Sequence, residues 1–145
     1  MATRRCKVTL GSEYTIDPKL EQCCKEYFGA VPKVGPCKLD PMTQKFVRLL
    51  GGSNWPHVDK PGNGYICWPH HSHFAGYSWP EIWYIFLHEA SHALKGSDER
   101  EATIEALKAL PIGYRISTWR RIRQYLIEAG TLDIYLKNGK VFQIA

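Results

Sequence analysis

The chain has no hydrophobic run long enough to cross a membrane. Nowhere in its 145 residues do 18 or more apolar residues follow one another, so a membrane-spanning helix is not expected. The opening residues 1–7 also lack the apolar stretch that a secretory signal peptide needs. We therefore expect a cytoplasmic protein that does not associate with membranes.

A regular set of cysteines is also missing. The sequence has five, an odd number with irregular spacing: Cys6, Cys23, Cys24, Cys37 and Cys67. Small secreted domains that depend on disulfides carry an even number in a recurring framework. This pattern favours reduced thiols, and a bridge from Cys23 or Cys24 to Cys37 remains open as the alternative.

Repeats, low-complexity segments and a convincing linker are absent as well, so residues 1–145 are expected to form a single domain. Hydrophobic residues make up 44% and aromatic residues 12%, which is enough to build a sizeable core. The net charge of +5 favours acidic partners only weakly, because net charge affects solubility and encounter more than fold.

The most informative segment is His88-Glu89-Ala90-Ser91-His92. It matches the HExxH signature of zinc proteases. On a helix, side chains four residues apart lie on one face, so His88 and His92 can both bind one zinc ion. Glu89 would then take a proton from water beside the metal and pass it to the leaving amine. The plainer interpretation is a chance match, or a former zinc site that now only packs.

The flanking sequence predicts the helix that this geometry needs. Ser78-Trp79-Pro80-Glu81 is typical of a capping box, and Gly96 fits a C-cap. On a helical wheel, one apolar stripe contains Ile82, Trp83, Phe86, Leu87, Ala90 and Leu94. Another face contains Glu81, Ile85, His88 and His92. The ligand face is therefore expected to be separate from the core face.

A catalytic zinc usually has three protein ligands, and no histidine follows His92. The next segment predicts a turn and a second helix that begins with acids, of which Asp98, Glu101 and Glu105 share one face. Each of these three is a candidate for the third ligand. The plainer interpretation is that acids in a first turn favour the helix dipole, and Asp98 is well placed to act as a cap.

Several short motifs together resemble a known family. The segment Leu87 to Leu94, then Glu99-Arg100-Glu101-Ala102, Leu110-Pro111 and Ile116-Ser117, is similar to the ImmA/IrrE-type metallopeptidases of bacteria and their mobile elements. The similarity covers roughly residues 64–128. It implies a zinc-dependent peptidase in which the third ligand falls on Glu101, the acid directly before Ala102.

Shorter elements are predicted outside this helix pair. We expect an opening strand within residues 4–16 and a short helix over 41–50. Between them, a helix capped by Asp17 is expected to begin at Pro18, run to about Phe28 and end at Gly29. A strand over residues 65–68 would lead toward the active-site helix, and by analogy with other zinc proteases it would pair with an extended substrate.

Two weaker features precede the C-terminal part. His70, His71 and His73 could hold a second metal or stabilise an oxyanion, although a surface loop is the plainer interpretation. Tyr77, Tyr84 and Tyr114 are oxyanion donor candidates that nothing in the sequence separates. Packing is the plainer role for each tyrosine.

Residues 115–145 predict a basic helix and a β-hairpin. Ser117-Thr118 are expected to cap the helix, and Asn138-Gly139 is a strong signal for a two-residue turn within 132–144. The helix carries Arg115, Arg120, Arg121 and Arg123. This arrangement resembles half of a winged helix and is the basis for expecting weak nucleic-acid binding. A solvated basic face on a packed helix is the plainer interpretation.

Taken together, the sequence predicts a small α+β zincin-like domain with an HExxH helix, a second acidic helix and a small sheet. Its expected activity is hydrolysis of a peptide bond in a protein substrate, with Zn²⁺ held by His88, His92 and Glu101 and with Glu89 as the proton carrier. The alternative is a nucleic-acid-binding regulator, or a DNA-associated protease, on the same scaffold.

Overall fold

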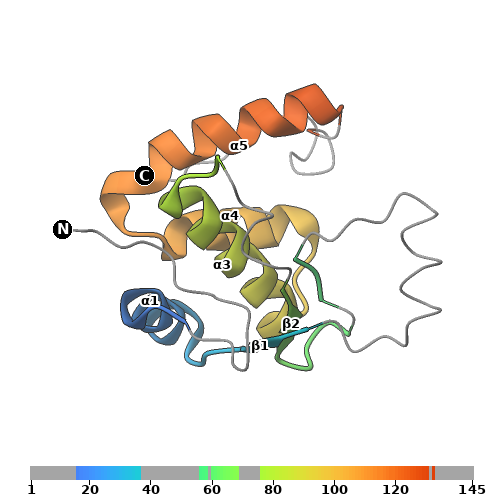
Figure 1. Cartoon of the computed structure of the whole chain (residues 1–145). Helices are drawn as coiled ribbons and strands as arrows, with labels where there is room; N and C mark the ends of the chain where they lie inside the picture. The colour runs from blue at the N-terminus through green and yellow to red at the C-terminus, as the bar shows by residue number, and fades with distance from the viewer. Residues whose placement is uncertain (1–15, 37–55, 59, 69–75, 131, 133–145) are drawn as a thin grey trace.

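A central helix, α3, organises the fold (Figure 1). The computed structural model describes residues 16–36, 56–58, 60–68, 76–130 and 132. In chain order the elements are α1 (Pro18–Phe28), β1 (Lys33–Gly35), β2 (Tyr65–Cys67), α3 (Trp79–Lys95), α4 (Glu99–Ala109), the 3₁₀ turn η2 (Ile112–Tyr114) and α5 (Arg115–Ala129). This is a small α+β domain, as predicted.

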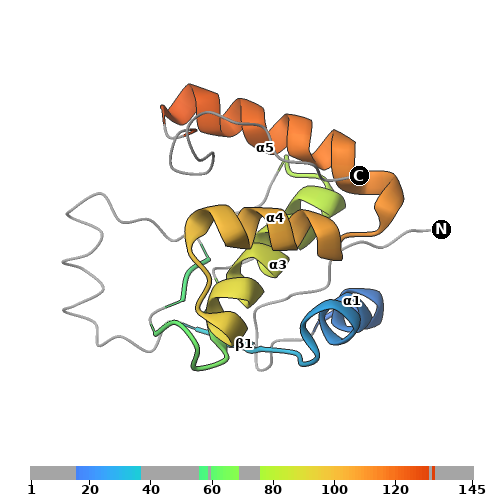
Figure 2. The same ribbon diagram turned by 180° about the vertical axis from the view of Figure 1, so that it is seen from behind.

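The helices are arranged around α3 (Figures 1 and 2). Helices α1 and α5 lie on opposite sides of α3, and α4 packs across it. Sheet contacts reach α3 through β2. Each neighbouring element therefore buries its apolar face against the same helix, which places α3 inside the molecule.

The ends of α3 lie where the sequence predicts them. At its start, the Ser78 amide donates a hydrogen bond to Glu81 Oε2 at 3.4 Å, as in a capping box. At its end, Gly96 has φ 67° and its amide donates to the His92 carbonyl at 3.0 Å. That left-handed conformation costs little for glycine because glycine has no Cβ. These caps fix the register of the HExxH segment.

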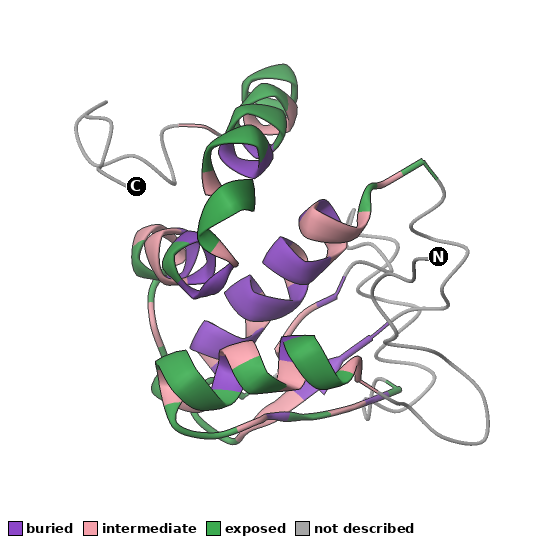
Figure 3. Ribbon diagram, turned by 90° about the vertical axis from the view of Figure 1, so that its left-hand side faces the viewer, coloured by how far each residue is buried: buried purple, intermediate pink, exposed green. Residues whose placement is uncertain are grey.

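Burial along α3 extends further round the helix than the predicted stripe (Figure 3). Phe86, Leu87 and Ala90 are fully buried, as expected, and so is Ser91. His88 is also buried, at 8% exposed. The ligand face is therefore not a solvent face, because α4 covers it. Such burial requires that the polar atoms on this face find partners.

The sheet consists of two parallel strands in the described residues. Val34 of β1 is paired with Ile66 of β2. The turn before β2 then docks on the end of α3: the amides of Gly62 and Gly64 donate to the carbonyls of His92 and Ala93, at 3.0 and 2.8 Å. The His92 carbonyl thus accepts from Gly62 as well as from the cap residue Gly96, and these bonds join the sheet to the HExxH helix.

Two other helix predictions have different outcomes. Helix α1 begins after its cap Asp17, whose carboxylate accepts from the Lys19 amide at 2.8 Å, and it ends at Gly29, as predicted. Helix α5 begins at Arg115, so the prediction that Ser117-Thr118 cap it is wrong. The reason is that η2 runs directly into α5, so the helix is already formed at Ser117.

Some predictions fall outside the described residues. These are the strand within 4–16, of which only Ile16 is described, the helix over 41–50, the hairpin over 132–144, of which only Leu132 is described, and the histidines at 70, 71 and 73. Within the described residues, every helix is too short or too polar to cross a membrane.

Candidate metal centre

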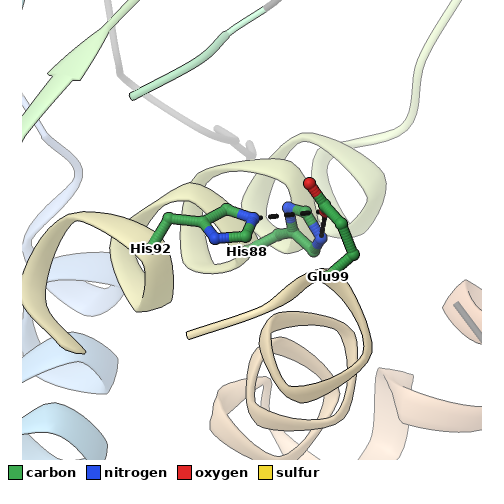
Figure 4. Close-up of side chains that lie close together, drawn as sticks. All are labelled: His88, His92 and Glu99. Carbon is green, nitrogen blue, oxygen red and sulfur yellow. Dashed lines mark hydrogen bonds and ion pairs between the residues drawn. The ribbon is translucent and has the colours of Figure 1, made fainter. Parts of the chain in front are cut away.

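The two histidines of the HExxH segment lie side by side on α3 (Figure 4). Their ring centroids are 4.9 Å apart, with the ring planes nearly perpendicular at 83°. The helix repeat places residues four apart on one face, so neither ring needs a strained backbone to reach its position. The His88 ring also contacts that of Tyr84, with centroids 5.7 Å apart.

A carboxylate from α4 completes the group. Glu99 Oε1 lies 3.2 Å from His88 Nε2 and 3.2 Å from His92 Nε2 (Figure 4). The three potential ligand atoms lie within 4.8 Å of one another. Two helices therefore bring two imidazoles and one carboxylate to a single point. Within the described part of the chain, no other three His, Cys, Asp or Glu side chains bring potential metal-ligand atoms this close together.

These separations fit a small tetrahedral metal ion. Zinc binds histidine nitrogen and carboxylate oxygen at about 2.0–2.2 Å, so two ligands of a regular tetrahedron lie about 3.3–3.5 Å apart. The 3.2 Å distances from Glu99 to both histidines are close to that edge length. Two histidines and one carboxylate are also a ligand set used by catalytic zinc, which keeps a fourth position for water.

The other ring nitrogen of each histidine has an acceptor as partner. His92 Nδ1 lies 2.7 Å from the Ser97 carbonyl oxygen, and His88 Nδ1 lies 3.1 Å from Glu89 Oε2. Carbonyl and carboxylate oxygens only accept, so Nδ1 must carry the proton in both rings. Nε2 of each ring also faces a carboxylate, that of Glu99, so it donates there when the ring is protonated, and in the neutral ring that binds a metal its lone pair is available.

Without metal, His88, His92 and Glu99, called the trio below, share protons through hydrogen bonds. Burial alone would lower the pKa of His88, but hydrogen bonds to Glu89 and Glu99 outweigh it and raise the pKa to about 9. For His92, burial also acts to lower the pKa, and its hydrogen bond to Glu99 raises it overall. Hydrogen bonds from both histidines hold the pKa of Glu99 well below its usual range.

The structure does not bring Glu101, the expected third ligand, to the histidines. Glu101 is exposed, and its carboxylate accepts a hydrogen bond from the Asp98 amide at 3.2 Å. In return, Asp98 accepts from the Glu101 amide at 2.8 Å. These two acids thus form the capping box of α4. Both carboxylates serve the helix backbone, and Glu99 stands where Glu101 was expected.

Glu105, another candidate, faces a different set of partners. Its Oε1 accepts from Ser97 Oγ at 3.0 Å and from Ser91 Oγ, and its Oε2 pairs with Lys95. These hydrogen bonds, with Lys95 and Ser91 the main contributors, outweigh burial and lower the pKa of Glu105. The carboxylate is therefore engaged at the turn between α3 and α4.

The packing of α4 explains why Glu99 is the acid at the site. Helix α4 lays a stripe of small residues against α3, in which Ala102, Thr103 and Ala106 are fully buried. Glu99 lies three, four and seven residues before them, so it continues the same stripe. The acids considered from sequence lie on another face. The signal that could have identified Glu99 is its place on the stripe of small residues.

The candidate oxyanion donors occupy different surroundings. Tyr84 is buried one turn before His88, and its hydroxyl donates to Thr103 Oγ1 at 3.4 Å. Tyr77 packs on Tyr125, and Tyr114 packs on Trp79. Tyr84 is thus the tyrosine whose ring contacts a member of the trio.

Strand β2, with which a substrate was expected to pair, already makes hydrogen bonds within the protein on both of its edges. One side of β2 is paired with β1. On the other side, the Cys67 amide and carbonyl exchange hydrogen bonds with those of His57, at 2.8 and 3.1 Å. The Tyr65 amide donates to Asn63 Oδ1 at 3.0 Å. The Tyr65 amide and both backbone groups of Cys67, which a substrate strand would use, are therefore already bonded.

Comparison of the chain with protein-family models, with curated proteins and with solved structures gave no match. The resemblance to the ImmA/IrrE-type metallopeptidases therefore rests on the short motifs and on the order of the elements that carry them.

Proposed function

We propose that this protein is a zinc-dependent metallopeptidase that hydrolyses a peptide bond in a protein substrate. The observation that carries this proposal is the position of Glu99 Oε1, 3.2 Å from Nε2 of both HExxH histidines. A carboxylate that served only as a hydrogen-bond partner would need to meet one histidine, whereas this oxygen faces both. The ligand set of two histidines and one carboxylate leaves a coordination position for water or substrate.

Each residue has a distinct part in this proposal. His88, His92 and Glu99 would hold the metal through Nε2, Nε2 and Oε1. Zinc in such a site polarises a carbonyl and lowers the pKa of water to about 7. Glu89 would accept the proton of the attacking water and deliver it to the leaving amine. Its carboxylate lies against the His88 ring at 3.1 Å and is 13% exposed, so it adjoins the trio without being one of the ligands.

A relationship to the ImmA/IrrE-type metallopeptidases remains part of the proposal. Its support is the order of the elements: the HExxH helix α3 is followed by α4, which ends before Leu110-Pro111, and then by α5. The resemblance implied that the acid before Ala102 is a ligand, whereas we assign that role to Glu99.

Nucleic-acid binding is the weaker candidate. Of the four arginines on α5, Arg115 donates to the carbonyls of Leu110 and Lys108, and Arg121 pairs with Glu81. These contacts engage half of the expected basic face within the protein. If phosphates were bound, affinity would fall steeply with salt, with a log–log slope of about 0.9 per neutralised phosphate.

We also propose a cytoplasmic location. Cys23 and Cys24 of α1 carry free thiols. Unpaired cysteines are typical of reducing compartments.

The proposed function is tested by metal analysis and proteolysis with one matched variant. Purified protein should contain about one zinc per chain and cleave an unfolded protein such as casein. Glu89→Gln should keep the zinc and lose the cleavage, because the amide keeps the size of the side chain and cannot carry the proton. Cleavage that persists in Glu89→Gln, or that survives removal of zinc, would refute the proposed function.

A further inference from the structure

Apart from the metal-binding trio, a second hydrogen-bonded cluster joins α3 to α4. It consists of Ser91, Ser97 and Glu105, which lie on α3, on the connecting turn and on α4. Ser91 Oγ lies 2.8 Å from Ser97 Oγ, Ser97 Oγ lies 3.0 Å from Glu105 Oε1, and Ser91 Oγ also contacts that oxygen. Each hydroxyl has one proton, so the Glu105 carboxylate is the final acceptor in any arrangement.

The cluster holds a buried hydroxyl. Ser91 is fully buried, and a buried donor without an acceptor would destabilise the fold. Glu105, with 17% of its side chain exposed, supplies that acceptor across the α3–α4 boundary. Its second oxygen pairs with Lys95 at the end of α3. The carboxylate is therefore fixed from both sides.

The turn that this cluster fixes carries two groups of the metal centre. The Ser97 carbonyl oxygen lies 2.7 Å from His92 Nδ1 and so orients that ring. Two residues later, Glu99 begins α4 and reaches both histidines. A shift of the turn would therefore displace the His92 acceptor and the third ligand together.

We infer that Glu105 is a positioning residue for the metal centre, acting through Ser91 and Ser97 on His92 and Glu99. This inference rests on the proposed zinc site and identifies what holds its geometry. Glu105 touches none of the three ligands in these contacts; it fixes the segment on which one ligand, and the partner of another, are carried. Groups that orient metal ligands typically contribute 10–100-fold to metal affinity.

The test compares two acids of the same helix. Glu105→Ala removes the acceptor of the cluster, and Glu101→Ala removes an exposed carboxylate of the capping box as a matched control. Glu105→Gln is the conservative variant, because its amide oxygen can still accept from the serines. Zinc affinity is measured by competition with a chromophoric chelator, and the visible spectrum is recorded for protein saturated with cobalt. Circular dichroism checks folding.

We expect Glu105→Ala to bind zinc about 10–100-fold more weakly than the wild type and to change the cobalt spectrum. Glu101→Ala should have the wild-type spectrum and affinity, and Glu105→Gln should recover most of both. A cobalt spectrum and a zinc affinity unchanged in a folded Glu105→Ala, whatever its thermal stability, would overturn the inference and leave the zinc site standing.

A second variant covers the case in which Glu105→Ala does not fold. Ser97→Ala removes the hydroxyl and keeps the carbonyl that faces His92. It should weaken zinc binding in the same direction, and wild-type affinity in this variant together with failed rescue by Glu105→Gln would overturn the inference. Failure of the proposed function is distinguishable, because it would appear in the wild type as absent proteolysis despite normal zinc binding.

Discussion

The two ring nitrogens of His92 have different tasks. Nδ1 is held by the Ser97 carbonyl at 2.7 Å, and Nε2 faces Glu99. His88 has the same division between Glu89 and Glu99. Each imidazole is therefore orientated before a metal arrives, which reduces the entropy lost on binding.

The preorganised histidines lead to the first prediction. His88→Ala should abolish stoichiometric zinc binding, because it removes a ligand and leaves the carboxylates of Glu89 and Glu99 without that partner. Zinc per chain, measured by atomic absorption after dialysis, should fall from about one to near zero. Stoichiometric zinc that survives His88→Ala would refute the proposed centre.

Cys24 gives a second prediction, about pH. Burial, with a smaller effect of the neighbouring Cys23, raises the pKa of Cys24 from 9.0 to about 12. Since the folded pKa is the higher one, the neutral thiol stabilises the fold fully below pH 9, and this contribution is lost as the pH rises toward 12.

The thiolate is the reactive form, so native Cys24 should resist alkylation at pH 8 and react once the chain is unfolded in urea. Tandem mass spectrometry can separate its labelling from that of Cys23. Equal labelling rates at Cys24 in native and unfolded protein would contradict its burial.

Among the elements, the start of α4 has the strictest requirement. The capping box of Asp98 and Glu101 sets where the helix begins, and Glu99 occupies its first position. A helix that began one residue later would leave Glu99 outside it, so the helix would no longer hold the Glu99 carboxylate toward the histidines. Loss of one cap bond weakens this start but leaves α4 packed on α3 through Ala102, Thr103 and Ala106.

Asp98→Ala should therefore separate stability from metal binding. Loss of the bond to the Glu101 amide should lower the free energy of unfolding by about 1 kcal/mol, as measured by urea denaturation. Zinc should still bind, because Asp98 is not one of the trio. Loss of zinc comparable with that of His88→Ala would instead identify Asp98 as a ligand.

The elements also show what the sequence could predict. Local signals located α1 and α3: Asp17, Ser78 and Gly96 act as caps where predicted, because capping depends on a few adjacent residues. The third ligand depends on how α4 meets α3. The pattern of acids left three candidates and the family resemblance favoured Glu101, whereas the small residues that pack on α3 place Glu99 there.

The start of α5 also could not be predicted from local residue types alone. Ser117 is a good cap residue by type, yet it lies inside the helix because η2 precedes it without a break. Residue type predicts where a helix can begin, and the preceding chain decides where it does.

For the whole molecule, a metal ion would act as a link between α3 and α4. Because the ligands come from both helices, binding should favour the folded chain over the unfolded chain. At free zinc 100 times the dissociation constant, the stabilisation is about 2.7 kcal/mol, which corresponds to a rise in Tm on the order of 10 °C for a domain of this size.

Removal of zinc by a chelator should lower Tm by that amount, and added zinc should restore it. The His88→Ala variant is the control, since its Tm should not respond to zinc. A wild-type Tm that is the same with and without zinc would contradict a link between the helices.

The measurement that tests the account most directly is the zinc dissociation constant of the wild type, Glu99→Ala and Glu101→Ala, determined by competition with a chelator. Glu99→Ala should bind zinc about 100-fold more weakly or worse, because a binding free energy on the order of 10 kcal/mol is shared among few ligands. Glu101→Ala should match the wild type, because its carboxylate caps α4. Wild-type affinity in Glu99→Ala together with loss of zinc in Glu101→Ala would contradict the account.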